Sequence, residues 1–312
     1  MNTHKYRRRL DREDLGRVLT ESGVDCGGVR EWSELTEASY NTAYRIKLTD
    51  GTGLVLKVAP DPEAPALTYE HGLMRTEAEF YRAALGKAPV PEVVHISGNE
   101  FLLMTELPGA NWFGQRSAIT EPAGLRTELG RHVAALHEIT GPGFGYPQNR
   151  LLPGWRAAFT AMMADILADA ERYEAPLPIA EIRGLVHANE HLLDAVRTPV
   201  LVHFDLWDGN ILVHDGRISG LVDGERAMWA DPVAEFVSLA LFGDIEQDQA
   251  FFDGYGPFEF TGDIRRRLAM YRCYLFLIMI VEGMPRGYQG ARHEQVMAHT
   301  RQLLDRQLDR LR

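Results

Sequence analysis

One short segment of this chain, Val202 to Asp223, combines hairpin-forming residues with a cluster of polar side chains. Two apolar runs, Ile211–His214 and Arg217–Val222, flank the pair Asp215-Gly216, which favours the two-residue turn of a β-hairpin. The turn sets the register of the two strands, and therefore determines which side chains meet at the open end of the hairpin.

The open end of this hairpin is predicted to form a cation site. Pairing outward from the turn places Ile211 opposite Gly220 and so brings Asn210 close to Asp223, with Asp205 five residues before Asn210. An amide oxygen and a carboxylate that converge are hard ligands, which Mg²⁺ accepts when phosphate groups complete its shell. The arrangement indicates phosphoryl transfer, and a polar hairpin end with solvated carboxylates is the alternative.

Length and composition limit the class of protein. The chain has 312 residues, 45% of them hydrophobic and 25% charged, which is enough for a two-lobed soluble protein. The longest apolar run, Tyr274–Val281, is too short to span a bilayer and predicts a buried helix near the C-terminus. The N-terminus lacks the apolar core of a signal peptide, and the two cysteines, Cys26 and Cys273, are far apart, which favours a reduced, cytoplasmic setting. A net charge of −11 argues against a nucleic-acid partner, and no membrane partner is expected.

Three strands are predicted near the N-terminus, at Trp32–Thr36, Ala43–Thr49 and Leu54–Ala59, with Asp50-Gly51 turning the second into the third. Lys57 lies inside the third, apolar strand, where a buried ammonium group needs a carboxylate partner. An alternating strand that exposes Lys57 to solvent is the alternative.

The helix predicted at Tyr69–Leu85 offers two candidate partners for this lysine, Glu77 and Glu79. On a 3.6-residue period, Glu77 shares a face with apolar side chains, whereas Glu79 lies among arginines. A carboxylate on an apolar face demands a buried counter-charge, so Glu77 is predicted to pair with Lys57.

A strand at Glu100–Thr105 followed by Pro108-Gly109 marks the end of this region, and helical periodicity dominates the remainder of the chain. We therefore predict two lobes, residues 1–107 and residues 108–312. Asp231 and Pro232 are residue types that start a helix. Longer helices are predicted in the second lobe at Pro122–Ile139, Trp155–Glu171, Ile182–Val196 and Arg265–Gly287.

The order of His203, Asp205 and Asn210, followed by a hairpin ending in Asp223, resembles the catalytic loop and metal-binding segment of the protein-kinase-like fold. The segment HFDLWDGNIL is similar to the aminoglycoside phosphotransferase and choline-kinase-like family, and the similarity extends over roughly Leu35 to Phe236. It implies an α+β fold of two lobes, a small β-rich N-terminal lobe that binds nucleotide and a larger, mainly helical C-terminal lobe that holds the catalytic and acceptor-binding groups.

The resemblance also implies a role for each candidate residue. Asp205 orients an acceptor hydroxyl and takes its proton, while Asn210 and Asp223 hold Mg²⁺ at the phosphates of ATP or GTP. The residues implied in nucleotide binding are Ser39 in the phosphate loop, Lys57 at the phosphates, Glu77 as the partner of Lys57, and the backbone of Thr105 and Leu107 at the purine edge.

The acceptor that the family implies is a small molecule with a free hydroxyl group. An aminoglycoside-like or other sugar-bearing antibiotic is the first hypothesis, a metabolic kinase for choline, a sugar or an amino alcohol is the second, and a nucleotide-binding pseudokinase is the third. Phe204, Trp207 and Gly224 depart from the commonest family pattern, which often has glycine in place of Phe204. A protein kinase is disfavoured because only about eight residues separate Asp223 from Asp231, too few for a long activation loop.

Overall fold

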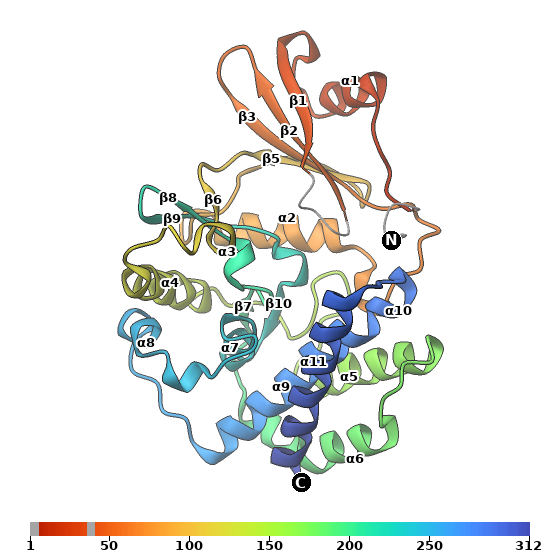
Figure 1. Cartoon of the computed structure of the whole chain (residues 1–312), viewed down its shortest axis with the longest axis vertical. Helices are drawn as coiled ribbons and strands as arrows, with labels where there is room; N and C mark the ends of the chain where they lie inside the picture. Colours follow the sequence, from red (N-terminus) through yellow and green to blue (C-terminus); the bar gives the residue numbers. More distant parts are fainter. Residues whose placement is uncertain (1–5, 36–40) are drawn as a thin grey trace.

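The computed structural model of the chain describes residues 6–35 and 41–312, which form a small β-rich N-terminal lobe and a larger, mainly helical C-terminal lobe (Figure 1). The N-terminal lobe holds a five-stranded antiparallel sheet in the order β1-β2-β3-β5-β4. Its elements are α1 (Arg12–Glu21), β1 (Val29–Leu35), β2 (Thr42–Leu48), β3 (Gly53–Val58), α2 (Leu73–Ala84), β4 (Val93–Ser97) and β5 (Phe101–Thr105). The predicted α+β architecture is confirmed, and the boundary between residues 107 and 108 stays a prediction.

The two faces of this sheet have different neighbours, because successive side chains of a strand point to opposite sides. On one face, Leu56 and Leu103 pack with Leu19 of α1 in a small separate core. On the other face, Leu102 joins the main core together with α2. Lys57 follows Leu56 in the alternation, so its side chain points to the α2 side of the sheet.

The C-terminal lobe is built of helices around two small sheets, β6-β8-β9 and β10-β7. Its strands are β6 (Ala110–Asn111), β7 (Val200–Val202), β8 (Ile211–His214), β9 (Arg217–Leu221) and β10 (Met228–Ala230). Its helices are α3 (Trp112–Gln115), α4 (Pro122–His137), α5 (Trp155–Arg172), α6 (Ile179–Asn189), α7 (Phe236–Leu239), α8 (Gln249–Tyr255), α9 (Gly262–Val281), α10 (Gly283–Arg286) and α11 (Ala291–Leu311). Figure 1 shows α2 lying between the five-stranded sheet and these helices, and α11 lies along α9.

Helix α9 lies in the core of the C-terminal lobe, as the apolar run Tyr274–Val281 predicted. Among the described residues, the helical segment Gly262–Arg286 is long and apolar enough to cross a membrane by length and composition. However, 78% of its most apolar window is buried inside the protein. Tyr271 of this helix accepts the indole N–H of Trp155 at 2.7 Å, so α9 is tied to α5 and serves as a core helix.

The observed elements differ from the predicted ones in three places. Helix α2 begins at Leu73 rather than Tyr69, because Gly72 adopts a left-handed φ of 93° and a 3₁₀ turn, Thr68–Glu70, precedes it. Strand β4 was not among the predicted strands, and it forms the edge of the sheet beside β5. The helix predicted at Ile182–Val196 begins at Ile179 and continues beyond Asn189 only as 3₁₀ turns.

Candidate active site

Strands β8 and β9 form the predicted hairpin around a tight turn. Asp215 and Gly216 have φ angles of 49° and 73°, the left-handed values that a type I′ turn requires. The register predicted for the far end is wrong, because Ile211 pairs with Leu221 and not with Gly220. A bulge on β9 shifts the register by one residue, which turn residues alone do not reveal.

The bulge determines which groups meet at the open end of the hairpin. The N–H of Val222 donates to the carbonyl of Asn210 at 3.0 Å, so Asp223 leaves the strand beside Asn210. Asp223 has a left-handed φ of 60°, and the 3₁₀ turn Gly224–Arg226 comes directly after it. Asn210 and Asp223 are therefore neighbours at the open end, as the sequence predicts.

Lys57 of β3 connects this end of the hairpin to helix α2. Its ammonium group contacts Asp223 Oδ1 and Glu77 Oε1, the latter at 2.6 Å. Lys57 is only 7% exposed and Glu77 is fully buried, so the alternative of a solvent-facing lysine is wrong. The predicted ion pair between Lys57 and Glu77 is present, and Glu79 lies on the exposed face of α2.

Tyr81, one helical turn after Glu77, connects the same groups by a second route. Its hydroxyl donates to Glu77 Oε1 at 2.6 Å and accepts the backbone N–H of Asp223 at 3.0 Å. Helix α2 is thus attached to the segment after β9 independently of the lysine.

The charges in this cluster are set by burial and by the lysine. Burial alone would lower the pKa of Lys57, but Asp223 and Glu77 hold it well above its usual value. Burial raises the pKa of Asp223, yet Lys57 outweighs it and the pKa lies below the usual range. Burial raises the pKa of Glu77 to about 7, although Lys57 opposes the shift. Asp223 is therefore the carboxylate that Lys57 keeps ionised.

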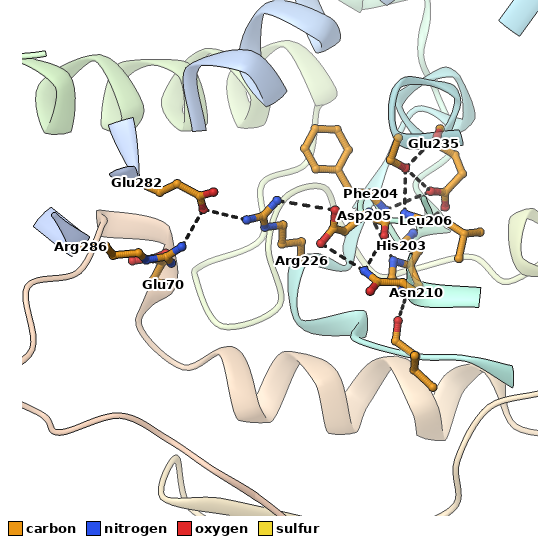
Figure 2. Close-up of polar contacts among 12 residues, drawn as sticks. Glu70, His203, Phe204, Asp205, Leu206, Asn210, Arg226, Glu235, Glu282 and Arg286 are labelled. Atoms are coloured by element: carbon orange, nitrogen blue, oxygen red, sulfur yellow. Dashed lines mark hydrogen bonds and ion pairs between the residues drawn. The ribbon is translucent and has the colours of Figure 1, made fainter. Parts of the chain in front are cut away.

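Asp205 lies on the loop after β7, and buried side chains hold the backbone of this loop (Figure 2). The carboxylate of Glu235 accepts the N–H of His203 at 2.6 Å and the N–H of Phe204 at 3.0 Å. Glu235 is fully buried, so these two bonds satisfy a carboxylate that would otherwise be costly to desolvate. The loop residues before Asp205 are therefore fixed from within the C-terminal lobe.

The backbone of this loop is strained at Phe204, whose φ is 62°. A left-handed conformation costs a residue with a side chain about 1–2 kcal/mol, which explains why glycine suits this position. The ring of Phe204 is buried and lies 5.8 Å from the ring of Tyr274, measured between centroids. Ser238 Oγ accepts the N–H of Leu206 at 2.9 Å. Burial and the bonds to the loop backbone offset the strain.

The carboxylate of Asp205 contacts two side chains, one at each oxygen. The amide nitrogen of Asn210 donates to the Asp205 carbonyl at 2.8 Å and reaches Oδ2 at 3.3 Å. The guanidinium of Arg226 lies 3.7 Å from Oδ1. Burial raises the pKa of Asp205 to about 7, and Arg226 opposes this shift. Asp205 can therefore accept a proton near neutral pH.

Asn210 and Asp223 have the ligand types that suit a divalent cation. Because the amide nitrogen of Asn210 donates to Asp205, its amide oxygen is the branch turned away from that residue. Asp223 uses one oxygen for Lys57, and its side chain is 46% exposed. An amide oxygen beside a half-exposed carboxylate fits Mg²⁺, which keeps several positions for phosphate oxygens and water.

Two of the other residues predicted to contact nucleotide are described: Thr105 ends β5, and Leu107 follows it by two residues. The N–H of Thr105 donates to the carbonyl of Glu92 at 2.9 Å, so this N–H is engaged within the protein. Leu107 lies against Gly220 of β9. The two are so close that a Cβ added to Gly220 would be 2.7 Å from Leu107 Cδ1. Contact of Thr105 and Leu107 with a purine stays a prediction, and Ser39 lies outside the described residues.

Several residues of the site were not predicted from the sequence. Glu225 and Arg226 come shortly after Asp223, and this proximity is the signal that could have identified them. The amide of Asn41 donates to Glu225 Oε2 at 2.8 Å, which joins the start of β2 to the segment after β9. Glu235 lies far along the chain from the loop it holds, and no local pattern marks it.

Phosphoryl-transfer enzymes of the protein-kinase-like fold place a lysine–glutamate pair, a loop aspartate and a cation site between a β-rich lobe and a helical lobe. A buried lysine–glutamate pair, Lys57 with Glu77, and a loop aspartate, Asp205, are present here as well. The phosphotransferase enzyme family (APH) matches residues 31–271, and the chain belongs to this family. The predicted resemblance is confirmed, and the chain is a phosphotransferase.

Two curated relatives are aminoglycoside 3'-phosphotransferases. The relative from Staphylococcus aureus is 27% identical over 226 residues, which cover 67% of this chain and 81% of the relative. The relative from Enterococcus faecalis is 28% identical over 187 residues, which cover 55% of this chain and 67% of the relative.

Solved structures share the fold over nearly the whole chain. A protein from Thermobifida fusca YX-ER1 assigned as a fructosamine-3-kinase has a TM-score of 0.71 and 23% identity, covering 95% of this chain and 100% of its own. A thermostable mutant of the aminoglycoside phosphotransferase APH(4)-Ia, in a ternary complex with ADP and hygromycin B, has a TM-score of 0.67 and 20% identity, covering 94% of this chain and 97% of its own. These similarities confirm the protein-kinase-like fold.

Proposed function

We propose that this phosphotransferase transfers the γ-phosphate of ATP or GTP to a hydroxyl group of an antibiotic, aminoglycoside-like or otherwise sugar-bearing. The observation that carries the proposal is the position of Asp205, on a fixed loop and hydrogen-bonded to Asn210, next to the hairpin end where Lys57 meets Asp223. The two curated relatives, both aminoglycoside 3'-phosphotransferases, support an acceptor of this class.

Each residue has one task in the proposed reaction. Asn210 and Asp223 would hold Mg²⁺, which would supply positive charge at the phosphates when bound. Lys57 adds a second positive charge, and Glu77 holds its position. Asp205 orients the acceptor hydroxyl and takes its proton while the new O–P bond forms and the bond to the leaving nucleoside diphosphate breaks. Catalysis then rests mainly on positioning and charge stabilisation.

The donor is proposed to bind between the sheet and the hairpin. The backbone of Thr105 and Leu107 contacts the purine edge, and Ser39 contacts the phosphates. The neighbour solved with ADP supports ATP as donor, and GTP is the other donor to test. This assignment divides the chain into a nucleotide-binding lobe, residues 1–107, and a catalytic and acceptor-binding lobe, residues 108–312. Two unpaired cysteines, one exposed and one buried, suit a reducing, cytoplasmic setting.

A metabolic kinase for a sugar, choline or an amino alcohol is the second candidate. The neighbour assigned as a fructosamine-3-kinase, which covers 95% of this chain, favours it. A nucleotide-binding pseudokinase is the third, and the joint presence of Lys57, Glu77, Asp205, Asn210 and Asp223 argues against it.

The test is phosphate transfer by purified protein with Mg²⁺, using ATP and GTP separately. The acceptor panel contains aminoglycosides, other sugar-bearing antibiotics, choline, simple sugars and glycated amines, and the readout is a mass gain of one phosphate on the acceptor. A product on one antibiotic supports the proposal, and the modified hydroxyl locates the acceptor relative to Asp205. A product only on choline, a sugar or a glycated amine supports the second candidate. Nucleotide binding with no product on any acceptor contradicts the antibiotic proposal and leaves an untested metabolite or a pseudokinase.

A further inference from the structure

A row of alternating charges leads away from the carboxylate of Asp205 (Figure 2). Arg226 lies between Asp205 and Glu282, and its Nη2 is 2.9 Å from Glu282 Oε2. The same Glu282 oxygen is 2.9 Å from Nη1 of Arg286, whose other terminal nitrogen contacts Glu70. Three carboxylates and two guanidinium groups thus alternate in sign from the loop to the start of α2.

The row connects segments that are far apart in the sequence. Arg226 belongs to the 3₁₀ turn after Asp223. Glu282 joins α9 to α10, Arg286 ends α10, and Glu70 lies just before α2. The side chains of Arg226, Glu282 and Arg286 are 13%, 16% and 13% exposed, and that of Glu70 is 1% exposed. Because charges this deeply buried need partners, each member of the row holds its neighbours in place.

Each oxygen of the Asp205 carboxylate has a different neighbour. Asn210 contacts its Oδ2, and in the proposed function Asn210 also has to face the cation. Arg226 approaches Oδ1 from the opposite branch of the carboxylate. We propose that Arg226 is a positioning residue, which keeps the Asp205 carboxylate turned toward the acceptor, and that Glu282 keeps Arg226 in place. This inference rests on the proposed function, because it assigns Asp205 the task of meeting the acceptor hydroxyl.

The test compares Arg226→Gln, Arg226→Lys and Glu282→Gln with a matched control, Arg267→Gln. Arg267 is 11% exposed and pairs with Asp231 at 3.0 Å, so the control removes a similarly buried guanidinium from another ion pair. We expect Arg226→Gln to lower kcat roughly tenfold or more, with KM for the nucleotide changed less than about twofold, because Asp205 loses the electrostatic attraction of a guanidinium 3.7 Å from its carboxylate. Arg226→Lys restores part of kcat, since the charge remains.

Glu282→Gln tests the second half of the inference without touching Arg226 itself. We expect a smaller fall in kcat, roughly three- to tenfold, because Arg226 loses the charge of one partner, Glu282, but keeps the other partner, Asp205. The double variant Arg226→Gln with Glu282→Gln should be no worse than Arg226→Gln alone, since Glu282 acts through the arginine. Equal losses of kcat in Arg226→Gln, Arg226→Lys and Arg267→Gln would show a merely structural arginine and overturn the inference.

A crystal structure of Arg226→Gln separates this inference from the proposed function. The side chain of Asp205 should rotate away from its wild-type direction in that variant and keep it in Arg267→Gln. An unmoved Asp205 carboxylate overturns the inference even if the wild type phosphorylates an antibiotic. A rotated carboxylate supports it even if the acceptor panel gives no product, in which case only the proposed function fails.

Discussion

The site has two sides, a lysine side formed by Lys57, Glu77 and Asp223, and a loop side formed by Asp205 and Arg226. The two sides differ in how closely the aspartate of each is paired with a positive charge. Asp223 contacts Lys57 directly, whereas Asp205 Oδ1 is 3.7 Å from Arg226. Burial raises the pKa of both carboxyl groups. Lys57 nevertheless brings the pKa of Asp223 below its usual range, while that of Asp205 rises to about 7.

This difference separates two chemical tasks between residues of one type. A cation ligand has to remain an anion, and a general base has to accept a proton near neutral pH. The partner decides which task each aspartate suits, because a direct ammonium contact stabilises the anion more than a guanidinium at longer range. Removal of the two aspartates is therefore predicted to affect different steps, turnover on the loop side and binding of cation and nucleotide on the lysine side.

The largest expected effect is on the loop side. Asp205→Ala should lower turnover by about 10²–10⁴-fold, because the proposed general base is lost, and should leave nucleotide affinity nearly intact. Asp223→Ala on the lysine side should instead weaken binding of Mg²⁺ and nucleotide. Steady-state kinetics and calorimetric nucleotide titration measure both. If Asp205→Ala kept more than about a tenth of the activity, the assignment of the base would fail.

A smaller effect is expected from Glu77→Gln on the lysine side. The variant replaces a buried carboxylate beside Lys57 with a neutral amide, while Asp223 remains as the lysine's partner. We expect the free energy of unfolding to fall by about 2–3 kcal/mol, and KM for the nucleotide to rise with KM for the acceptor unchanged. Glu79→Gln is the matched control on the exposed face of α2, where about 0.5 kcal/mol or less is expected. Equal urea midpoints for the two variants would contradict the role of the buried pair.

The lysine side could be predicted from the sequence because each of its parts leaves a local pattern. Lys57 interrupts an apolar strand, and Glu77 lies on the apolar face of a helical repeat, so their pairing can be inferred although they are 20 residues apart. The tight turn of the hairpin can likewise be inferred from Asp215-Gly216.

The loop side could not be predicted to the same extent, because distant segments build it. The bulge in β9 comes with a hydrogen bond from Ser219 Oγ to the carbonyl of Pro108, 111 residues away. Arg226 reaches Glu282, which is 56 residues further along the chain. Ion pairs of this kind depend on which helices pack together, and no periodicity in the sequence records that.

Phe204 adopts a backbone conformation that usually favours glycine, because its surroundings stabilise it. A φ of 62° favours glycine, and the bonds from Glu235 together with burial of the ring against Tyr274 keep phenylalanine in that conformation. The sequence marked Phe204 as a departure from the family pattern, but only the structure shows that the cost lies in the backbone.

The smallest expected effect is on the pH dependence of stability, and it concerns His203, which lies between the two sides. Its Nε2 donates to the carbonyl of Val222 at 2.9 Å, next to Asp223, and its Nδ1 accepts the N–H of Asp205 at 3.3 Å. These two bonds need the neutral ring, because a protonated imidazole has no acceptor. Burial accordingly lowers the pKa of His203 to about 4.

The lowered pKa predicts a loss of stability in acid. The unfolded chain binds a proton at His203 near its ordinary pKa of about 6.5, whereas the folded chain does so only near 4. The stabilisation is therefore complete above about pH 6.5 and declines as the pH falls, by about 1 kcal/mol between pH 7.5 and pH 5.5. Urea unfolding at both pH values should show this difference shrink in His203→Gln and persist in His187→Gln, whose side chain is 81% exposed. An unchanged difference in His203→Gln would mean that folding does not lower the pKa of His203, and that the folded protein does not require the neutral ring between the two sides.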